Sequence, residues 1–170
     1  MSKLCFNYFK IIKASDATIN EINETRLDPT VLFPSPYAIT PSTDLSGYDM
    51  KIDFAWRENT YGTRWMHNDD SESNVHTIQF NENRMEATFI SAWNPPLGFY
   101  DLLSRKYPDL EFYYEYQEPT AGICGHGTAG GIVRKPHTTF YKYDDADQYE
   151  SIKTLHNWTY KPFDTFYEKN

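Results

Sequence analysis

Hydrophobic and polar side chains alternate along residues 85–93 and again along residues 110–117. Side chains of a β-strand alternate between its two faces, so each segment is predicted to be a strand with one core-facing side. In the first strand the odd positions, which end with Trp93, are expected to face the core. Asn94-Pro95-Pro96 ends this strand, and proline suits the first turn of a helix. Apolar side chains then recur at helical spacings of three and four: Leu97, Tyr100, Leu103 and Tyr107.

Further strand and helix patterns surround this strand–helix–strand unit. In chain order they are a strand at 4–12, a helix at 16–27, a short helical period at Ile52, Ala55 and Trp56, a hairpin of 75–80 with 85–93, a hairpin of 110–117 with the glycine-rich 118–133, a strand at 137–143 and a polar helix at 144–155. The last helix is expected to bury a stripe formed by Tyr149, Ile152 and Leu155.

This order of elements predicts an α+β fold. The expected architecture is a ferredoxin-like sandwich, βαββαβ with an extra antiparallel strand, with the helices on one face of an antiparallel sheet. Residues 1–136 are assigned to this domain, including a proline-rich insertion at 28–50 that packs on its surface. Residues 137–170 are assigned to a C-terminal extension, and its many aromatic side chains suggest that it docks on the body.

Composition and charge narrow the classes of function. The 170 residues are 17% aromatic and carry a formal net charge of −8, so the chain is expected to fold and direct nucleic-acid binding is not expected. A basic protein surface remains possible as a partner. The two cysteines, Cys5 and Cys124, indicate no disulfide framework. No apolar run is long enough to span a membrane and no signal peptide is seen, so we expect a cytoplasmic protein.

Four groups of residues match motifs of a known family. In chain order they are Leu4-Cys5-Phe6-Asn7; Trp56-Arg57 with Thr60-Tyr61-Gly62-Thr63-Arg64-Trp65; Phe89-Ile90-Ser91-Ala92-Trp93-Asn94-Pro95-Pro96 with Tyr107-Pro108-Asp109-Leu110; and Tyr116-Gln117-Glu118 followed by Gly122 and Gly125. In order and spacing they resemble the YubB-type proteins of plasmids and phages, which share a ferredoxin-like domain. The chain departs from that pattern at Leu4 and Tyr61, where the family has tryptophan.

The resemblance implies a ferredoxin-like fold and a setting on a mobile genetic element. It implies no catalytic residues, because the family has no assigned biochemical activity. The residues expected to define the fold are Trp56, Gly62, Trp65, Trp93, Pro95 and Pro96. The aromatic cluster of Trp56, Tyr61, Trp65 and Trp93 is either part of the core or a recognition surface, since tryptophan and tyrosine are common in both.

Candidate chemistry is sparse. The glycine-rich segment 122–131 lacks the lysine and the following helix of a phosphate loop, so we interpret it as a bulged strand. His67-Asn68-Asp69-Asp70 is interpreted as a solvated acidic loop, and no histidine or cysteine spacing supports a metal site. Glu86, Glu111 and Glu115 are expected as open carboxylates on the polar face of the sheet. No cofactor and no catalytic residue is therefore predicted.

Three functional hypotheses remain. The first is a non-enzymatic interaction protein of a phage or plasmid, an inhibitor of a host defence complex such as a CRISPR effector that acts through an acidic surface. Its candidate contact residues are Asp69, Asp70, Glu72, Tyr61, Arg64, Asp144, Asp145, Asp147 and Glu150. The second is a protein that sequesters a nucleotide signal, with Gly122, Cys124, His126, Gly127 and Trp65 as its ligand site. The third is a metal-dependent hydrolase or nuclease that uses His67, Asp69 and Asp70, or Cys124 and His126.

Overall fold

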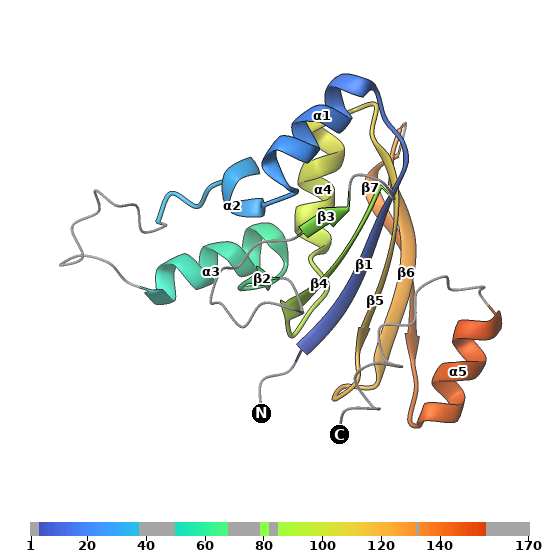
Figure 1. The fold of residues 1–170 in the computed structure, drawn as a ribbon. Coiled ribbons are helices and arrows are strands. Elements are labelled where there is room, and N and C mark those ends of the chain that lie inside the picture. Colours follow the sequence, from blue (N-terminus) through green and yellow to red (C-terminus); the bar gives the residue numbers. More distant parts are fainter. Residues whose placement is uncertain (1–3, 38–49, 68–78, 82–84, 132, 156–170) are drawn as a thin grey trace.

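The computed structural model describes residues 4–37, 50–67, 79–81, 85–131 and 133–155. Its centre is a seven-stranded, fully antiparallel sheet in the order β2-β4-β1-β5-β6-β7, with β3 paired to β4 (Figure 1). The strands are β1 (Leu4–Lys13), β2 (Met66–His67), β3 (Gln79–Asn81), β4 (Glu86–Ala92), β5 (Glu111–Glu118), β6 (Ile123–Gly130) and β7 (Val133–Lys142). The helices are α1 (Asp16–Thr25), α2 (Pro29–Leu32), α3 (Met50–Tyr61), α4 (Leu97–Lys106) and α5 (Ala146–Leu155).

The connectivity confirms the predicted ferredoxin-like α+β fold. The central strand β1 lies between β4 and β5, and the β4–α4–β5 unit is the strand–helix–strand unit expected from the alternating pattern. The hairpin of β3 with β4 and the hairpin of β5 with β6 are also present. Two strands, β6 and β7, extend the sheet beyond the ferredoxin-like core.

The main core lies between the sheet and the layer of α1, α2, α3 and α4 (Figure 1). The sheet contributes aromatic side chains at alternate positions, among them Phe9, Phe89, Phe112 and Tyr114. The rings of Tyr100 on α4 and Tyr114 on β5 have their centroids 4.7 Å apart. Because these rings are close-packed and fully desolvated, this face supplies most of the apolar burial of the fold.

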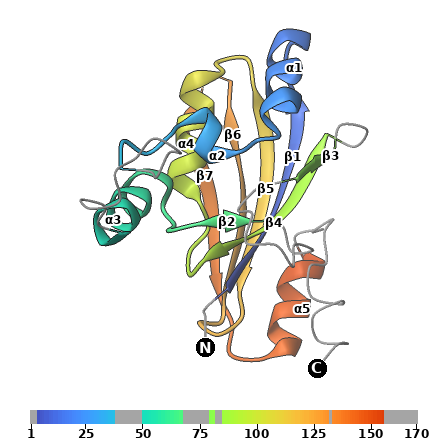
Figure 2. The same cartoon turned by 60° about the vertical axis from the view of Figure 1, so that its left-hand side comes forward.

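The opposite face of the sheet, which we call the second face, is partly covered by α5 (Figures 1 and 2). Tyr149 and Ile152 of α5 pack with Phe6, Ile90 and Cys124 of the sheet. Helices therefore cover both faces, and the expectation of helices on one face holds only for the ferredoxin-like core. The predicted apolar stripe of α5 was wrong at Leu155, because that side chain is 76% exposed.

The structure also locates the predicted segment boundaries. Residue 136 lies inside β7, so the expected boundary between domain and extension falls within a strand of the sheet. The segment 28–50 contains α2 and reaches the first residue of α3. Residues 38–49 of that segment, and residues 156–170 of the extension, lie outside the described residues.

The N-terminus of α1 is fixed by a residue from a distant motif. Ser15 is the N-cap, and its hydroxyl accepts a hydrogen bond from the amide of Thr18. Asp109, from the Tyr107-Pro108-Asp109-Leu110 motif, accepts from the amide of Ser15 at 2.8 Å and from the Thr18 hydroxyl at 2.9 Å. Hydrogen bonds from the side chain and backbone of Ser15, followed by Thr18, lower the pKa of Asp109 to about 2. The motif aspartate is thus a capping residue for α1.

We predict that Asp109→Asn lowers the stability of the fold in a pH-dependent way. The folded-state pKa of Asp109 is depressed, so its contribution is complete above its ordinary value of 3.8 and is lost as the pH falls toward about 2. Urea unfolding of wild type and Asp109→Asn from pH 6 to pH 2 measures this difference. The stability gap should be constant above about pH 5 and should shrink below pH 4. A gap that does not change with pH would contradict the assignment.

Candidate functional site

Five strand termini meet at one end of the sheet. Because the strands are antiparallel, β4, β5 and β7 end where β1 and β6 begin, at the lower end of the sheet in Figure 1. Strands in a sheet lie about 4.8 Å apart, so this end is about 19 Å wide from β4 to β7. We call it the lower rim and define it by Arg64, Trp93, the turn at 119–122, Asp144, Asp145 and Asp147.

Trp93 stands at the β4 side of the lower rim. It follows the last residue of β4, has a φ of +70° and is 48% exposed. The guanidinium of Arg64 lies over its ring, 4.9 Å from the centroid, and the Nε of Arg64 pairs with Glu58 at 2.6 Å. The φ reverses the direction of the side chain, so the expectation that Trp93 faces the core was wrong. A bulky side chain in the left-handed region costs energy, and such positions cluster at functional sites.

The second and third motif groups are joined by hydrogen bonds next to Trp93. The hydroxyl of Thr63 donates to the carbonyl of Ala92 at 2.8 Å, and the amide of Ala92 donates to the carbonyl of Trp65 at 3.1 Å. Gly62 has a φ of +85° and lies against the start of α4. A Cβ on Gly98 would overlap the backbone of Thr60 and Tyr61. The two glycines therefore allow the end of α3 to contact the start of α4.

The aromatic cluster proposed from the sequence is divided between three environments. Tyr61 is 2% exposed, and its ring packs edge-on against Trp56 at 5.3 Å. Trp65 packs in the cluster of the second face, and Trp93 alone is on the surface. Tyr61 was predicted to bind a partner. Its burial assigns it to the core, where its ring packs against Trp56 and its hydroxyl bonds to the backbone of α2.

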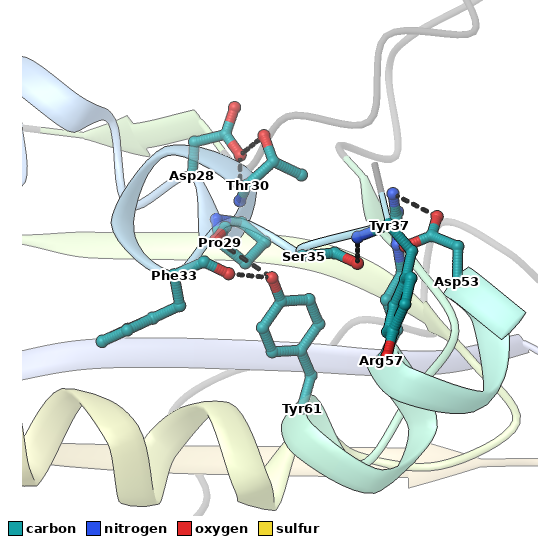
Figure 3. A network of polar contacts seen from close by, with 9 residues as sticks. All are labelled: Asp28, Pro29, Thr30, Phe33, Ser35, Tyr37, Asp53, Arg57 and Tyr61. Carbon is teal, nitrogen blue, oxygen red and sulfur yellow. Dashed lines mark hydrogen bonds and ion pairs between the residues drawn. The ribbon is translucent and has the colours of Figure 1, made fainter. Parts of the chain in front are cut away.

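Figure 3 shows how Tyr61 holds α2 and α3 together. Its hydroxyl donates to the carbonyls of Pro29 and Phe33 at the two ends of α2. In the same region Asp53 and Arg57 form an ion pair at 2.9 Å, and Asp53 is 1% exposed (Figure 3). Ile52, expected on the buried side of this helix, is 50% exposed. The inner face of α3 therefore carries a buried ion pair beside Trp56 and Tyr61, and a search for an apolar stripe does not detect that pair.

The middle of the lower rim is the turn between β5 and β6. Glu118 is buried, and its carboxylate accepts hydrogen bonds from the amide of Thr120 at 3.1 Å and from the amide of Ala121. Gly122 completes the turn with a φ of +60°. Gly122, predicted as a ligand-binding glycine, thus meets a backbone requirement of the turn. The buried carboxylate of Glu118 fixes the turn by accepting from these two backbone amides.

The β7 side of the lower rim is acidic. Asp144, Asp145 and Asp147 are exposed just before and within the first turn of α5. Asp145 accepts from the amide of Gln148 at 2.8 Å, and the side chain of Gln148 accepts from the amide of Asp144 at 3.0 Å. This arrangement resembles a capping box, with the return bond to the residue before the N-cap, and it holds the carboxylate of Asp145 and the backbone of Asp144 in place. Glu150, the fourth predicted acid here, pairs with the buried Lys153.

The glycine-rich strand β6 makes room for tyrosines from the neighbouring strand. A Cβ on Gly125 would overlap the hydroxyl of Tyr116, and a Cβ on Gly127 would overlap the carbonyl of His137. The hydroxyl of Tyr114 passes beneath Gly127 and donates to that same carbonyl at 3.0 Å. Tyrosines occupy the space that these glycines leave, so Gly127 belongs to the core packing rather than to an open ligand site.

The two side chains suggested as a nucleophile pair lie on the second face. Cys124 is fully buried, and burial raises the pKa of its thiol to about 12. His126 lies between two tyrosines, with ring centroids 6.1 Å from both Tyr113 and Tyr141. A thiol with this pKa is protonated at neutral pH and is a poor nucleophile. Cys124 and His126 are therefore parts of a packed aromatic layer rather than a nucleophile pair.

The carboxylates of the second face are held by tyrosines. Tyr8 donates to Glu86 at 2.9 Å, and Tyr113 donates to Glu115 at 2.7 Å. Glu115 is buried, so the expectation of an open carboxylate was wrong at this position. Burial, together with the hydrogen bond to Glu115, raises the pKa of Tyr113. Neither tyrosine pairing was anticipated, although Tyr113 and Glu115 share a strand face in the alternating pattern.

The remaining candidates are the acids that follow β2 and the metal and membrane sites. Asp69, Asp70 and Glu72 lie outside the described residues. Within the described ranges, no three His, Cys, Asp or Glu side chains are grouped so as to hold a metal ion. No helix in that part of the chain has the length and apolar character needed to cross a bilayer.

Comparison with known proteins gives one match. A family model described as "Ferredoxin-like domain in Api92-like protein" matches residues 60–153, which is more than half of the chain. The matched range runs from the end of α3 to α5 and so includes every residue of the lower rim. No curated protein and no solved structure matches the chain.

We predict that both cysteines are unreactive in the folded protein. Burial raises the pKa of Cys5 and of Cys124, and both side chains are fully buried. Labelling with a thiol reagent at pH 8 should be at least a hundredfold slower in native buffer than in guanidinium chloride, because it requires unfolding. Rapid native labelling of Cys124, identified by mass spectrometry, would contradict this and would support a nucleophilic thiol.

We predict that Trp93→Gly leaves the stability within about 1 kcal/mol of wild type, since glycine relieves the backbone strain while the exposed ring is lost. Trp93→Ala keeps the φ of +70° and loses the same ring. It should be less stable than Trp93→Gly by about 1 kcal/mol. Chemical denaturation of the three proteins measures both differences. If alanine were the more stable replacement, the left-handed conformation of residue 93 would not be a source of strain.

Proposed function

We propose that this chain, which belongs to the family of ferredoxin-like domains in Api92-like proteins, is a non-enzymatic protein-interaction module that binds a basic surface of its partner. The observation that supports this most is the charge distribution of the lower rim. Asp144, Asp145 and Asp147 are exposed together beside the end of β7. Carboxylates held in this way attract a cationic surface and speed its association.

These three aspartates lie together within four positions, whereas Asp16 and Glu24, which are also exposed without a described ion pair, lie at opposite ends of α1. Many carboxylates pair with a lysine or arginine: Glu21, Asp53, Glu58, Asp101, Glu111 and Glu150. Within the parts of the chain that the structure describes, Asp144, Asp145 and Asp147 form no ion pair. Their charge is therefore available to a partner. The hydrogen bonds at the start of α5 hold the carboxylate of Asp145 before the partner arrives, which lowers the cost of binding there.

Trp93 and Arg64 form the other half of the proposed contact surface. Tryptophan and arginine are the residues most often found at the energetic centre of protein interfaces. The pair stands at the same end of the sheet as the aspartates, with the rigid turn at 119–122 between them. A partner that covers the lower rim would therefore touch an aromatic anchor at one side and unpaired carboxylates at the other.

The proposed partner rests on charge and on the resemblance to YubB-type proteins of plasmids and phages. A groove that accepts nucleic acid is basic, and spaced carboxylates can imitate the phosphates that it binds. We propose that the protein acts in the cytoplasm of a host cell and blocks a nucleic-acid-binding defence complex, for example a CRISPR effector. This is consistent with a net charge of −8.

An interaction role is also favoured over the two alternatives by the state of their candidate residues. A nucleotide-binding strand would need space that Tyr114 and Tyr116 occupy. A hydrolase built on Cys124 would need a thiolate, whereas the pKa of that thiol is about 12. The side chains of His67, Asp69 and Asp70 lie outside the described residues, so a metal-dependent nuclease built on them stays a prediction.

We predict that Asp144→Lys/Asp147→Lys weakens partner binding at least tenfold while the fold is retained. Both positions are exposed, and the capping residue Asp145 is left intact. The matched control is Asp16→Lys/Glu24→Lys, which changes the net charge by the same amount on α1, at the opposite end of the molecule (Figure 1). Asp16 and Asp147 occupy the first turns of their helices, so the effect on helix stability is also matched.

The assay measures inhibition of target-DNA binding by purified CRISPR effector–guide complexes, at low and at high salt. Wild type and the α1 control should inhibit, the rim variant should lose at least tenfold in potency, and inhibition should weaken as salt rises. Trp93→Gly should also lose potency. Equal inhibition by the rim variant and the α1 control would contradict the acidic contact. If no effector is inhibited, wild type and the rim variant are compared for capture of basic host proteins. Capture by wild type but not by the rim variant would redirect the proposal to another defence complex.

A further inference from the structure

Strand β7 forms an outer edge of the sheet. It pairs with β6 on one side, and no described strand lies on its other side. The helix α5 that follows it turns away beneath the sheet toward β1 and β4 (Figure 2). Edge strands offer unpaired backbone groups to other chains, and natural proteins usually shorten or blunt them. At ten residues β7 is as long as the central strand β1.

The register identifies which backbone groups of β7 point outward. The amide of Tyr143 donates to the carbonyl of Gly122 at 2.8 Å, and this pair continues the register of Ile123 with Lys142. In an antiparallel ladder bonded pairs alternate with non-bonded ones. Tyr141, Thr139 and His137 are therefore bonded to β6. Thr138, Phe140 and Lys142 direct their amides and carbonyls to the free edge.

Proline occurs in this strand where the same alternation allows it. Pro136 falls on an outward-facing position, so its missing amide removes no bond to β6. Pairing of another strand with β7 is thereby confined to the stretch that begins at residue 137. In this stretch Phe140 is 56% exposed, an unusual place for a phenylalanine on a strand edge.

We propose that the occupant of this edge is a second copy of the chain, paired antiparallel through β7 about a two-fold axis at Phe140. Phe140 then stands opposite Phe140 of the second copy, and Thr138 stands opposite Lys142. An aromatic pair opposite each other in adjacent strands is stabilising, and no like charges face one another. The three outward-facing residues of each copy would form about six backbone hydrogen bonds.

Alternative registers fit less well. A two-fold axis at Thr138 would place Phe140 opposite Pro136, which has no amide to donate. It would also place Lys142 opposite Arg134, and like charges directly opposite are destabilising. The register centred on Phe140 avoids both faults. Such a dimer joins two sheets into one and leaves the two lower rims at opposite ends, so it is independent of the proposed partner contact.

Charge substitutions at the two-fold axis test this inference. Phe140→Lys places two ammonium groups opposite each other, and Phe140→Glu places two carboxylates. Sedimentation equilibrium should give twice the chain mass of 20.0 kDa for wild type and the single-chain mass for each variant alone. An equimolar mixture of the two variants should recover the doubled mass, because lysine then faces glutamate. Ile52→Lys and Ile52→Glu, at a comparably exposed position on α3, should remain dimeric.

Backbone variants give a second readout. Lys142→Pro removes an outward amide without removing a bond to β6, whereas Lys142→Ala keeps that amide. The proline variant should dissociate at a concentration at least tenfold higher than the alanine variant. Circular dichroism confirms that each variant is folded. A wild type that stays at 20.0 kDa at millimolar concentration would overturn the proposal, as would a dimer that survives both Phe140 variants. A mixture that fails to reassociate would also overturn it.

Discussion

The contact between Gly62 and Gly98 is the constraint on which the arrangement of the site depends. The end of α3 and the start of α4 approach so closely that a Cβ on Gly98 would overlap the backbone of Thr60 and Tyr61. This approach brings the segment 62–65 beside the end of β4, where Thr63 bonds to Ala92. Tyr61 is thereby directed into the core, while Trp93 is directed to the surface. One steric condition thus fixes both the end of α3, which carries Tyr61, and the segment that bonds to β4 next to Trp93.

The strands were predictable because their faces differ strongly. Phe112 and Tyr114 pack inward, so the alternation along β5 is strong enough to be recognised without any structure. The same reasoning failed at Trp93, since a left-handed φ after the last strand residue cancels the alternation. It also failed on α3, whose inward face carries the Asp53–Arg57 pair. The spacing of apolar residues predicts which apolar side chains are buried. It does not reveal a left-handed residue that turns its side chain outward, or a buried ion pair.

The candidate site was less predictable than the fold. The acidic start of α5 was recognised by composition alone. Whether its carboxylates are available to a partner depends on which of them are paired with a lysine or arginine nearby in space. Most ion pairs of the described chain lie within or between helices, and only the structure separates these from the aspartates of the lower rim. The tyrosines below Gly125 and Gly127 show the converse case, in which a sequence suggestive of ligand binding serves the packing of two strands.

The central position of β1 has a consequence for how the chain folds during synthesis. Its partners are far away in sequence, since Leu4 pairs with Ala92 and Phe6 pairs with Gln117. Contacts of such long range slow folding, because loop closure precedes any gain from pairing. β1 leaves the ribosome before either of its partners, so one edge stays unpaired until β4 is made and the other until β5 is made. β1 is thus exposed to aggregation during this interval, and chaperone binding to β1 is the expected safeguard.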